Sequence, residues 1–159
     1  MKNKKYIFLF VIGLALAIAT AAFLYNKFQP RTQSAVGVNC GPKALSGLLK
    51  YYRVEISPDS ISKLAETGKK GTSMLNMAIA ARYIGFESAG VKTDYAGLGN
   101  IPLPALAHIN NNHYIVLVAS MPDSVLLEDN GKRFFESRKN FIRQWAGNVL
   151  LVYPKQRIK

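Results

Sequence analysis

The stretch NCGPKALSGLLKYY, residues 39–52, decides how the rest of the chain is interpreted. Its apolar residues return at helical spacing, Asn39 is a suitable N-cap, and Pro42 is tolerated in the first turn of a helix. We therefore predict a helix that begins at Cys40. The only cysteine of the chain would then lie at the amino terminus of that helix.

The sequence after this stretch changes from helical to strand-like patterns. Ser57-Pro58 and Thr72-Ser73 are start signals for a second and a third helix, and Gly85 is a stop signal for the third. Short β-branched or apolar runs then follow, separated by turn residues. This order predicts an α+β domain in which helices precede a mainly antiparallel sheet. We expect strands at 103–109, 114–119, 125–128 and 149–153, turns at 110–112, 122–124 and 130–131, and a further helical segment at 141–145.

An uncharged apolar run, YIFLFVIGLALAIATAAFL, occupies residues 6–24 and is long enough as a helix to cross a bilayer. More basic residues precede it than follow closely, which favours a single-pass anchor in a bacterial inner or cytoplasmic membrane, with the rest on the extracytoplasmic side. A cleavable signal peptide is the competing interpretation, and the domain would then be secreted or periplasmic. We expect an anchor or signal peptide at 1–27, a linker loop at 28–38 and one domain at 39–159.

Composition narrows the classes of function. One cysteine excludes an internal disulfide, and two histidines without a cluster of ligands predict neither a metal nor a cofactor. The net charge of +12 favours an acidic partner such as anionic lipid or an acidic peptide. The basic pairs at 69–70, 132–133 and 138–139 lack any nucleic-acid-binding motif, so we expect a solvated basic surface and no nucleic acid partner.

Three side chains are candidates for nucleophilic chemistry. A thiol reacts as thiolate, and a helix amino terminus such as that predicted at Cys40 lowers its pKa, although a lone cysteine is also a common small core residue. His113 follows a polar turn and starts an apolar run, so it suits a general base better than His108, which lies inside the run ALAHI. Asp129 ends the next run and is placed to orient an imidazole, although Asp-Asn-Gly is also an ordinary turn sequence.

Taken together, several segments resemble bacteriocin-processing cysteine peptidases that remove double-glycine leader peptides. The resemblance covers about residues 33–153, and several motifs in the right order are more specific than any one of them. The segments are NCGPKALSGLLKYY (39–52), GTSMLNMAIAARYIGFE (71–87), LPALAHINNNHYIVLV (103–118), VLLEDNGKRF (125–134) and FIRQWAGNVLLV (141–152).

The resemblance implies a papain-like fold and assigns roles to particular residues. Cys40 in the CGP motif becomes the nucleophile, His113 the general base and Asp129 the residue that orients the histidine. Gln33 becomes the candidate oxyanion-hole donor, although it lies seven residues before Cys40, one more than the family's usual spacing. Asn130 follows the aspartate where the family commonly has proline, a change that affects the turn more than the chemistry.

The resemblance also implies a substrate class and a partner. We expect an endopeptidase that cleaves a leader or precursor peptide after small residues through a thioester, acting as a stand-alone enzyme or as half of a split system with an export transporter. Two other hypotheses remain open. One is a catalytically silent peptide-binding module that works with an export system. The other is a papain-like cell-wall amidase or transpeptidase.

Overall fold

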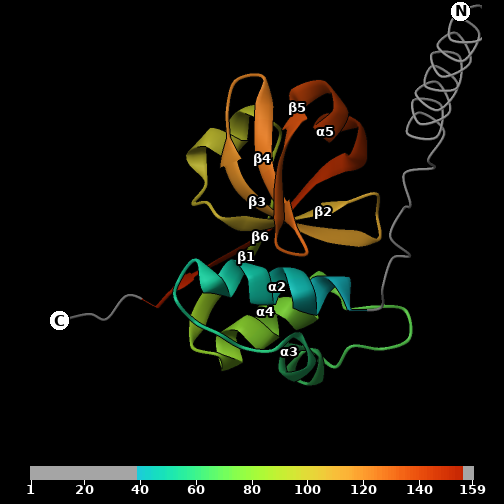
Figure 1. The fold of residues 1–159 in the computed structure, drawn as a ribbon, viewed down its shortest axis with the longest axis vertical. Coiled ribbons are helices and arrows are strands. Elements are labelled where there is room, and N and C mark those ends of the chain that lie inside the picture. The colour runs from blue at the N-terminus through green and yellow to red at the C-terminus, as the bar shows by residue number, and fades with distance from the viewer. Residues whose placement is uncertain (1–38, 156–159) are drawn as a thin grey trace, which may run out of the picture. The chain divides into compact units, whose positions relative to one another are not determined.

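The structure is a computed structural model in which residues 39–155 are described (Figure 1). The predicted membrane segment at 6–24, the linker at 28–38 and the candidate donor Gln33 lie outside the described residues. Within residues 39–155, none of the helices combines the length and the apolar character needed to span a membrane.

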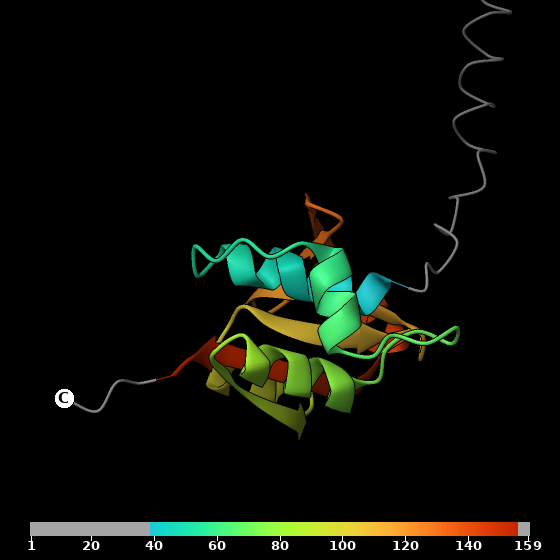
Figure 2. The same ribbon diagram turned by 90° about the horizontal axis from the view of Figure 1, so that it is seen from below.

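Three helices come first, as predicted, and lie together on one side of the sheet (Figures 1 and 2). Ser57 caps the second of them and Ser73 the third, each accepting a hydrogen bond from a backbone N–H at 3.1 Å. Gly85 follows the third helix with a φ of +100°, a conformation that glycine adopts without strain. The helices are α2 (Cys40–Lys50), α3 (Pro58–Leu64) and α4 (Met74–Tyr83).

The N-cap prediction for α2 is confirmed for the residue, but the capping hydrogen bond is absent. Asn39 is the N-cap residue, yet its side chain makes no capping hydrogen bond. Its Oδ1 instead accepts a hydrogen bond from the Ser62 hydroxyl on α3 at 3.4 Å. The backbone N–H groups at the start of α2 are therefore not capped by Asn39, and they remain able to stabilise a negative charge.

The described strands form one antiparallel sheet of six strands in the order β1-β6-β2-β3-β4-β5, which confirms the expected α+β class. A short 3-10 helix, η1, and a fourth α-helix, α5, complete the described elements. The bounds are β1 (Phe86–Lys92), η1 (Ala96–Asn100), β2 (Ala105–Ile109), β3 (His113–Ser120), β4 (Ser124–Asp129), β5 (Lys132–Ser137), α5 (Arg138–Gln144) and β6 (Trp145–Pro154).

Both faces of the central strands are buried. On β3, Tyr114 and Val116 face the helices, whereas Ile115 and Leu117 face the opposite side, where Phe141 of α5 packs. We call the first cluster the helical core and the second the distal core. Because successive side chains of β3 point to two buried faces, its sequence is a continuous apolar run and does not alternate between apolar and polar residues.

Two strands were not predicted, β1 and β5. The side chains of β5 are nearly all exposed, and its sequence KRFFES lacks a run of buried apolar residues. Its position follows from the tight turn at Asn130-Gly131, where both residues have positive φ, of 49° and 77°. The other missing strand, β1, pairs with β6, more than fifty residues away, and its sequence FESAGVK carries a weak strand signal.

Candidate active site

Helix α2 carries Cys40 to the end of the sheet where the inner strand β3 begins. The side chains of Leu45, Leu48 and Leu49 are fully buried in the helical core, so the helix is held firmly by apolar packing. Gly41, the residue after the cysteine, faces α4, and a Cβ at this position would lie 2.7 Å from the Met77 sulfur. The glycine of the CGP motif therefore permits the close approach of α4 beside the thiol.

Two tight turns carry the candidate base and its partner. His113 is the first residue of β3 and follows Asn110 and Asn111, whose φ angles of 50° and 57° form the sharp turn from β2. Asp129 is the last residue of β4 and precedes the Asn130-Gly131 turn into β5. Because β3 and β4 are antiparallel neighbours, the start of one lies beside the end of the other.

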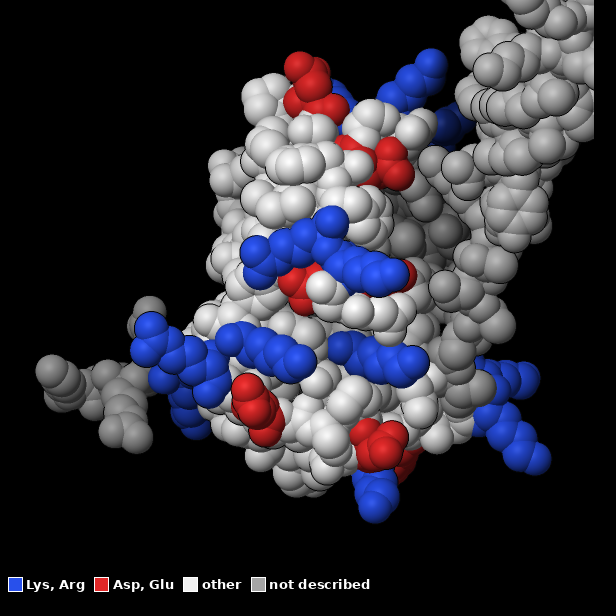
Figure 3. Space-filling view, viewed as in Figure 1, with Lys and Arg blue, Asp and Glu red and all other residues white. Residues whose placement is uncertain are grey.

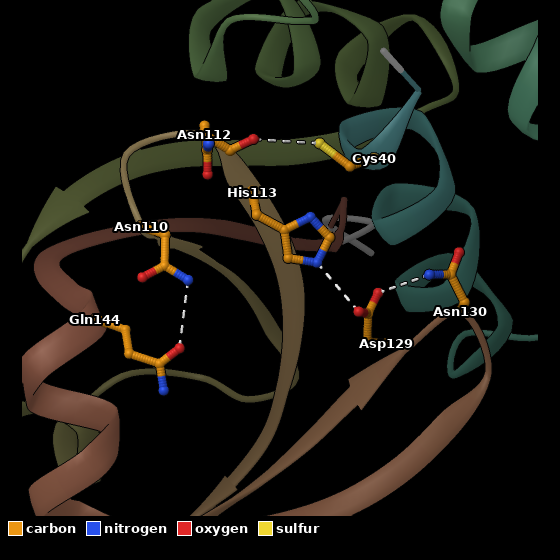
Figure 4. A network of polar contacts seen from close by, with 7 residues as sticks. All are labelled: Cys40, Asn110, Asn112, His113, Asp129, Asn130 and Gln144. Carbon is orange, nitrogen blue, oxygen red and sulfur yellow. Dashed lines mark hydrogen bonds and ion pairs between the residues drawn. The ribbon is translucent and has the colours of Figure 1, made fainter. Parts of the chain in front are cut away.

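The structure brings Cys40, His113 and Asp129 together where β3 begins and β4 ends (Figure 4). The Nε2 atom of His113 lies 3.1 Å from Oδ2 of Asp129, and the other carboxylate oxygen accepts a hydrogen bond from the Asn130 side chain at 3.0 Å. The second ring nitrogen of His113, Nδ1, is buried, has no hydrogen-bond partner among the described residues, and faces the cysteine. The Cys40 thiol makes a contact of 3.7 Å with the Asn112 carbonyl oxygen.

The pKa values of the thiol and the imidazole move toward each other. Burial alone raises the pKa of Cys40, but the neighbouring His113 and the backbone N–H groups of Tyr114 and Gly41 outweigh it, so the net pKa is lowered. The thiol raises the pKa of His113 against the opposing effect of burial, and the Asp129 carboxylate raises it further. Both shifts favour an ion pair of thiolate and imidazolium.

The rival base, His108, has a different environment. Its ring stacks on Tyr114 at a centroid distance of 4.5 Å. Burial lowers the pKa of His108, and the positive charge of His113 lowers it further, so both effects favour the neutral imidazole. Among residues 39–155, no carboxylate hydrogen-bonds to its ring. His108 therefore forms part of the wall of the site, whereas His113 has a carboxylate partner and a ring nitrogen that faces the thiol.

A pocket of about 510 Å³ opens beside the thiol. The loop between α3 and α4 lines one side of it, and the turn between β2 and β3 lines another. Sequence reasoning missed most of these residues, because nothing in a polar loop shows that it will fold over a site. The described residues that line it are Cys40, Lys69, Lys70, Gly71, Thr72, Ser73, His108, Asn111, Asn112 and Tyr114.

No candidate metal site exists within residues 39–155, since no group of three or more His, Cys, Asp or Glu side chains is arranged to hold an ion. A cysteine at a helix start, facing a histidine and an aspartate on neighbouring strands of an antiparallel sheet, defines the papain-like class of cysteine peptidase domains.

Comparison with known proteins agrees with this class. The model of the Peptidase C39 family matches residues 29–157, and the chain belongs to that family. The lactococcin-A transport/processing ATP-binding protein LcnC of Lactococcus lactis is 33% identical over 79% of the chain, but the match covers only 19% of that protein. The pediocin PA-1 transport/processing ATP-binding protein PedD of Pediococcus acidilactici is 25% identical over 76% of the chain. The match covers 18% of PedD, so the chain spans about a fifth of the length of these transporters.

Two solved structures share the fold. The peptidase domain of Streptococcus ComA, a bi-functional ABC transporter, has a TM-score of 0.69 and 26% identity, covering 74% of this chain and 92% of that domain. A double glycine motif protease from an AMS/PCAT transporter, solved with its leader peptide, has a TM-score of 0.70 and 25% identity, covering 75% of this chain and 86% of that protease. The expected papain-like, helix-then-sheet fold is thus confirmed for the described domain.

Proposed function

We propose that this chain is a cysteine endopeptidase that cleaves a leader or precursor peptide after small residues of the double-glycine type. Cys40 would be the nucleophile, His113 the general base and Asp129 the residue that orients it. The observation that carries the proposal is the imidazole of His113, which Asp129 holds at Nε2 while the buried and unpartnered Nδ1 faces the thiol. Relatives named as transport/processing proteins support the substrate class.

The first half of the proposed reaction forms a thioester. The Cys40 thiolate attacks the carbonyl carbon of the scissile peptide bond, and the electron pair of the carbonyl moves onto its oxygen. As the tetrahedral intermediate collapses, the carbon–nitrogen bond breaks and the His113 imidazolium gives its proton to the departing amine. The carboxyl-terminal part of the peptide leaves, and the amino-terminal part remains as a thioester on Cys40.

The second half regenerates the enzyme. Neutral His113 takes a proton from a water molecule, which attacks the thioester carbonyl and releases the leader peptide with a new carboxyl group. The Cys40 thiolate leaves and the ion pair with His113 is restored. Asp129 keeps the imidazole in one orientation through both steps and stabilises its positive charge.

The oxyanion of each tetrahedral intermediate needs hydrogen-bond donors beside the thiol. We propose the backbone N–H of Cys40 at the start of α2 as one donor, because the first N–H groups of a helix have no partner within the helix. The side chain of Gln33 is our second candidate. Replacing Gln33 by Ala would lower kcat by roughly 10²–10³-fold if it supplies a donor.

The arrangement along the chain also belongs to this proposal. Residues 1–27 would anchor the protein in a bacterial membrane or act as a signal peptide, residues 28–38 would be a linker, and the domain at 39–159 would work on the extracytoplasmic side. An export transporter that delivers the peptide is the proposed partner, since the named relatives contain transporter and peptidase in one protein.

The test is cleavage of synthetic precursor peptides by the purified full chain. Peptides whose leaders end in Gly-Gly should be cut after the second glycine, as seen by mass spectrometry, and replacement of either glycine by leucine should abolish cleavage. Stoichiometric peptide binding without cleavage would favour the silent binding module. Release of peptidoglycan fragments, with no cut in the Gly-Gly peptides, would favour the cell-wall amidase.

A further inference from the structure

The α3–α4 loop presents a pair of lysines at the pocket. Gly68 and Gly71 hydrogen-bond to each other through both backbone groups, at 3.2 and 3.0 Å, so that the two lysines form the tip of a tight hairpin. The hydroxyl groups of Thr67 and Thr72 lie 2.6 Å apart at its base. We call this segment, residues 67–72, the lysine hairpin. Its tip is held in place by hydrogen bonds at the base.

Lys69 and Lys70 both line the pocket that contains the Cys40 thiol. No aspartate or glutamate is among the described residues that line it, so the ionisable groups of the wall, apart from the cysteine and a tyrosine, are two lysines and His108. The ion pairs within residues 39–155 lie elsewhere, between His113 and Asp129 and between Arg133 and Glu128. The lysine hairpin thus brings positive charge to the wall of the pocket, and no described carboxylate of that wall neutralises it.

The other two basic pairs, at 132–133 and 138–139, include arginines that have partners away from this pocket. Arg133 is bound to Glu128 at 2.9 Å, and Arg138 lies over the ring of Tyr95 at 4.8 Å from its centroid. Figure 3 shows basic side chains over α2 and the β4–β5 hairpin, and others that project at the edge where Figure 1 places the α3–α4 loop. Of the three pairs noted in the sequence, only the pair at 69–70 lines a pocket with the thiol.

We propose that Lys69 and Lys70 form a specificity subsite that binds an acidic side chain of the peptide beside the scissile bond. This inference rests on the proposed function, because it takes Cys40 as the residue that attacks that bond. An ammonium group is a compact charge with three hydrogen-bond donors, and a peptide carboxylate in the pocket would approach it as an ion pair. Because both lysines are exposed, the gain is moderate, and we expect an Asp-for-Asn preference of roughly three- to tenfold in kcat/KM.

One test does not depend on peptide cleavage. Iodoacetate carries a negative charge and iodoacetamide is neutral, yet both alkylate the thiolate, forming a sulfur–carbon bond and releasing iodide. Cys40 is the only cysteine, so the reaction of the full chain reports one site. The ratio of the two rates at low ionic strength should fall about tenfold in the variant Lys69→Glu/Lys70→Glu and by less in Lys69→Gln/Lys70→Gln.

The control variant changes the net charge by the same amount, but at residues that do not line the pocket. Lys92 on β1 and Lys139 in α5 are exposed and do not line the pocket, so Lys92→Glu/Lys139→Glu should leave the ratio within about twofold of the wild type. Circular dichroism confirms that each variant is folded. An equal fall in the control and in the hairpin variant, or no fall in either, would overturn the proposal.

The second test uses pairs of precursor peptides that differ only in Asp or Asn at each position near the cut. The wild type should prefer Asp at one position, and Lys69→Glu/Lys70→Glu should remove or reverse that preference. Equal preference in wild type and variant overturns the subsite alone. Absence of any cleavage, with alkylation of Cys40 indifferent to His113, overturns the proposed function instead.

Discussion

The helical region and the strand ends hold the candidate site by different means. Cys40 begins a helix whose apolar face is fully buried in the helical core, so its position depends on how α2 packs against the sheet. His113 and Asp129 instead lie at tight turns on adjacent strands, where strand register and local hydrogen bonds fix them. The Asp–His pair is therefore held by contacts between neighbouring strands, whereas the Cys–His pair depends on how α2 packs against the sheet.

A polar contact joins the two regions at the far end of α2. The hydroxyl group of Tyr51 donates a hydrogen bond of 2.8 Å to Glu128 on β4, the residue before Asp129. The guanidinium of Arg133 binds the same carboxylate and lies 5.1 Å from the centroid of the Tyr51 ring. This cluster connects the strand that carries Asp129 with the helix that carries Cys40.

The largest effect is expected from removal of the nucleophile. Cys40→Ala should reduce peptide cleavage to the uncatalysed background, because no other thiol exists in the chain. The side chain is small and only partly buried, so the free energy of unfolding should change by about 1 kcal/mol or less. Cleavage assays and chemical denaturation measure the two effects. Residual cleavage at the wild-type rate would remove the nucleophile assignment.

The next largest effect is expected from the base. His113→Ala should lower kcat/KM by roughly 10²–10⁴-fold, because general acid–base catalysis contributes about that much. His108→Ala is the matched control, since its ring lines the pocket but lacks a carboxylate partner, and it should cost at most about tenfold through lost packing on Tyr114. A greater loss in His108→Ala than in His113→Ala would reverse the assignment of the base.

Docking of α2 is tested by a cavity in the helical core. Leu48→Ala should destabilise the fold by about 2–5 kcal/mol and also slow alkylation of Cys40, because the helix that carries the thiol loses its anchor. Leu98→Ala is the control, since this equally buried side chain lies in the distal core. It should cost similar stability in urea denaturation without changing alkylation under native conditions. An equal change in alkylation would show that docking of α2 has no special role.

The smallest effect is expected at the polar cluster between the regions. Tyr51→Phe removes the hydrogen bond to Glu128 and should cost about 0.5–1.5 kcal/mol in the free energy of unfolding. Tyr83→Phe provides the comparison, because that side chain is 76% exposed and should change stability by less than about 0.5 kcal/mol. Equal costs for the two substitutions would mean that the contact with Glu128 adds no stability.

Much of the fold was predictable because its signals are local. The helix starts at Ser57 and Ser73, the stop at Gly85 and the turns at 110–112 and 130–131 depend on a few neighbouring residues, and each is found in the structure. The juxtaposition of Cys40 with His113 was predicted from the resemblance to a family. The two residues are 73 positions apart, and the spacing of residues along the chain does not show which distant residues meet in the fold.

The remaining features depend on distant contacts. The exposed edge strand β5 follows a turn that was recognised, so the Asn-Gly signal could have revealed it. The lysine hairpin was noted only as a basic pair, because its position beside the thiol results from the packing of α3 and α4 on α2. The hydrogen bond between Ser62 and Asn39 likewise depends on the packing of α3 beside α2, so the residues around Asn39 do not by themselves predict it.

The central claim is that Cys40 and His113 form a working pair. The most direct measurement is the rate of Cys40 alkylation by iodoacetamide across pH, in the full chain and in His113→Ala. The lowered pKa of Cys40 predicts that wild-type labelling persists below the ordinary thiol pKa of ~8.5 and is lost only as pH falls through the lowered value. In His113→Ala only the backbone N–H groups of Tyr114 and Gly41 still oppose the effect of burial, so the midpoint should rise toward the ordinary thiol pKa. An identical midpoint in both proteins would contradict the account.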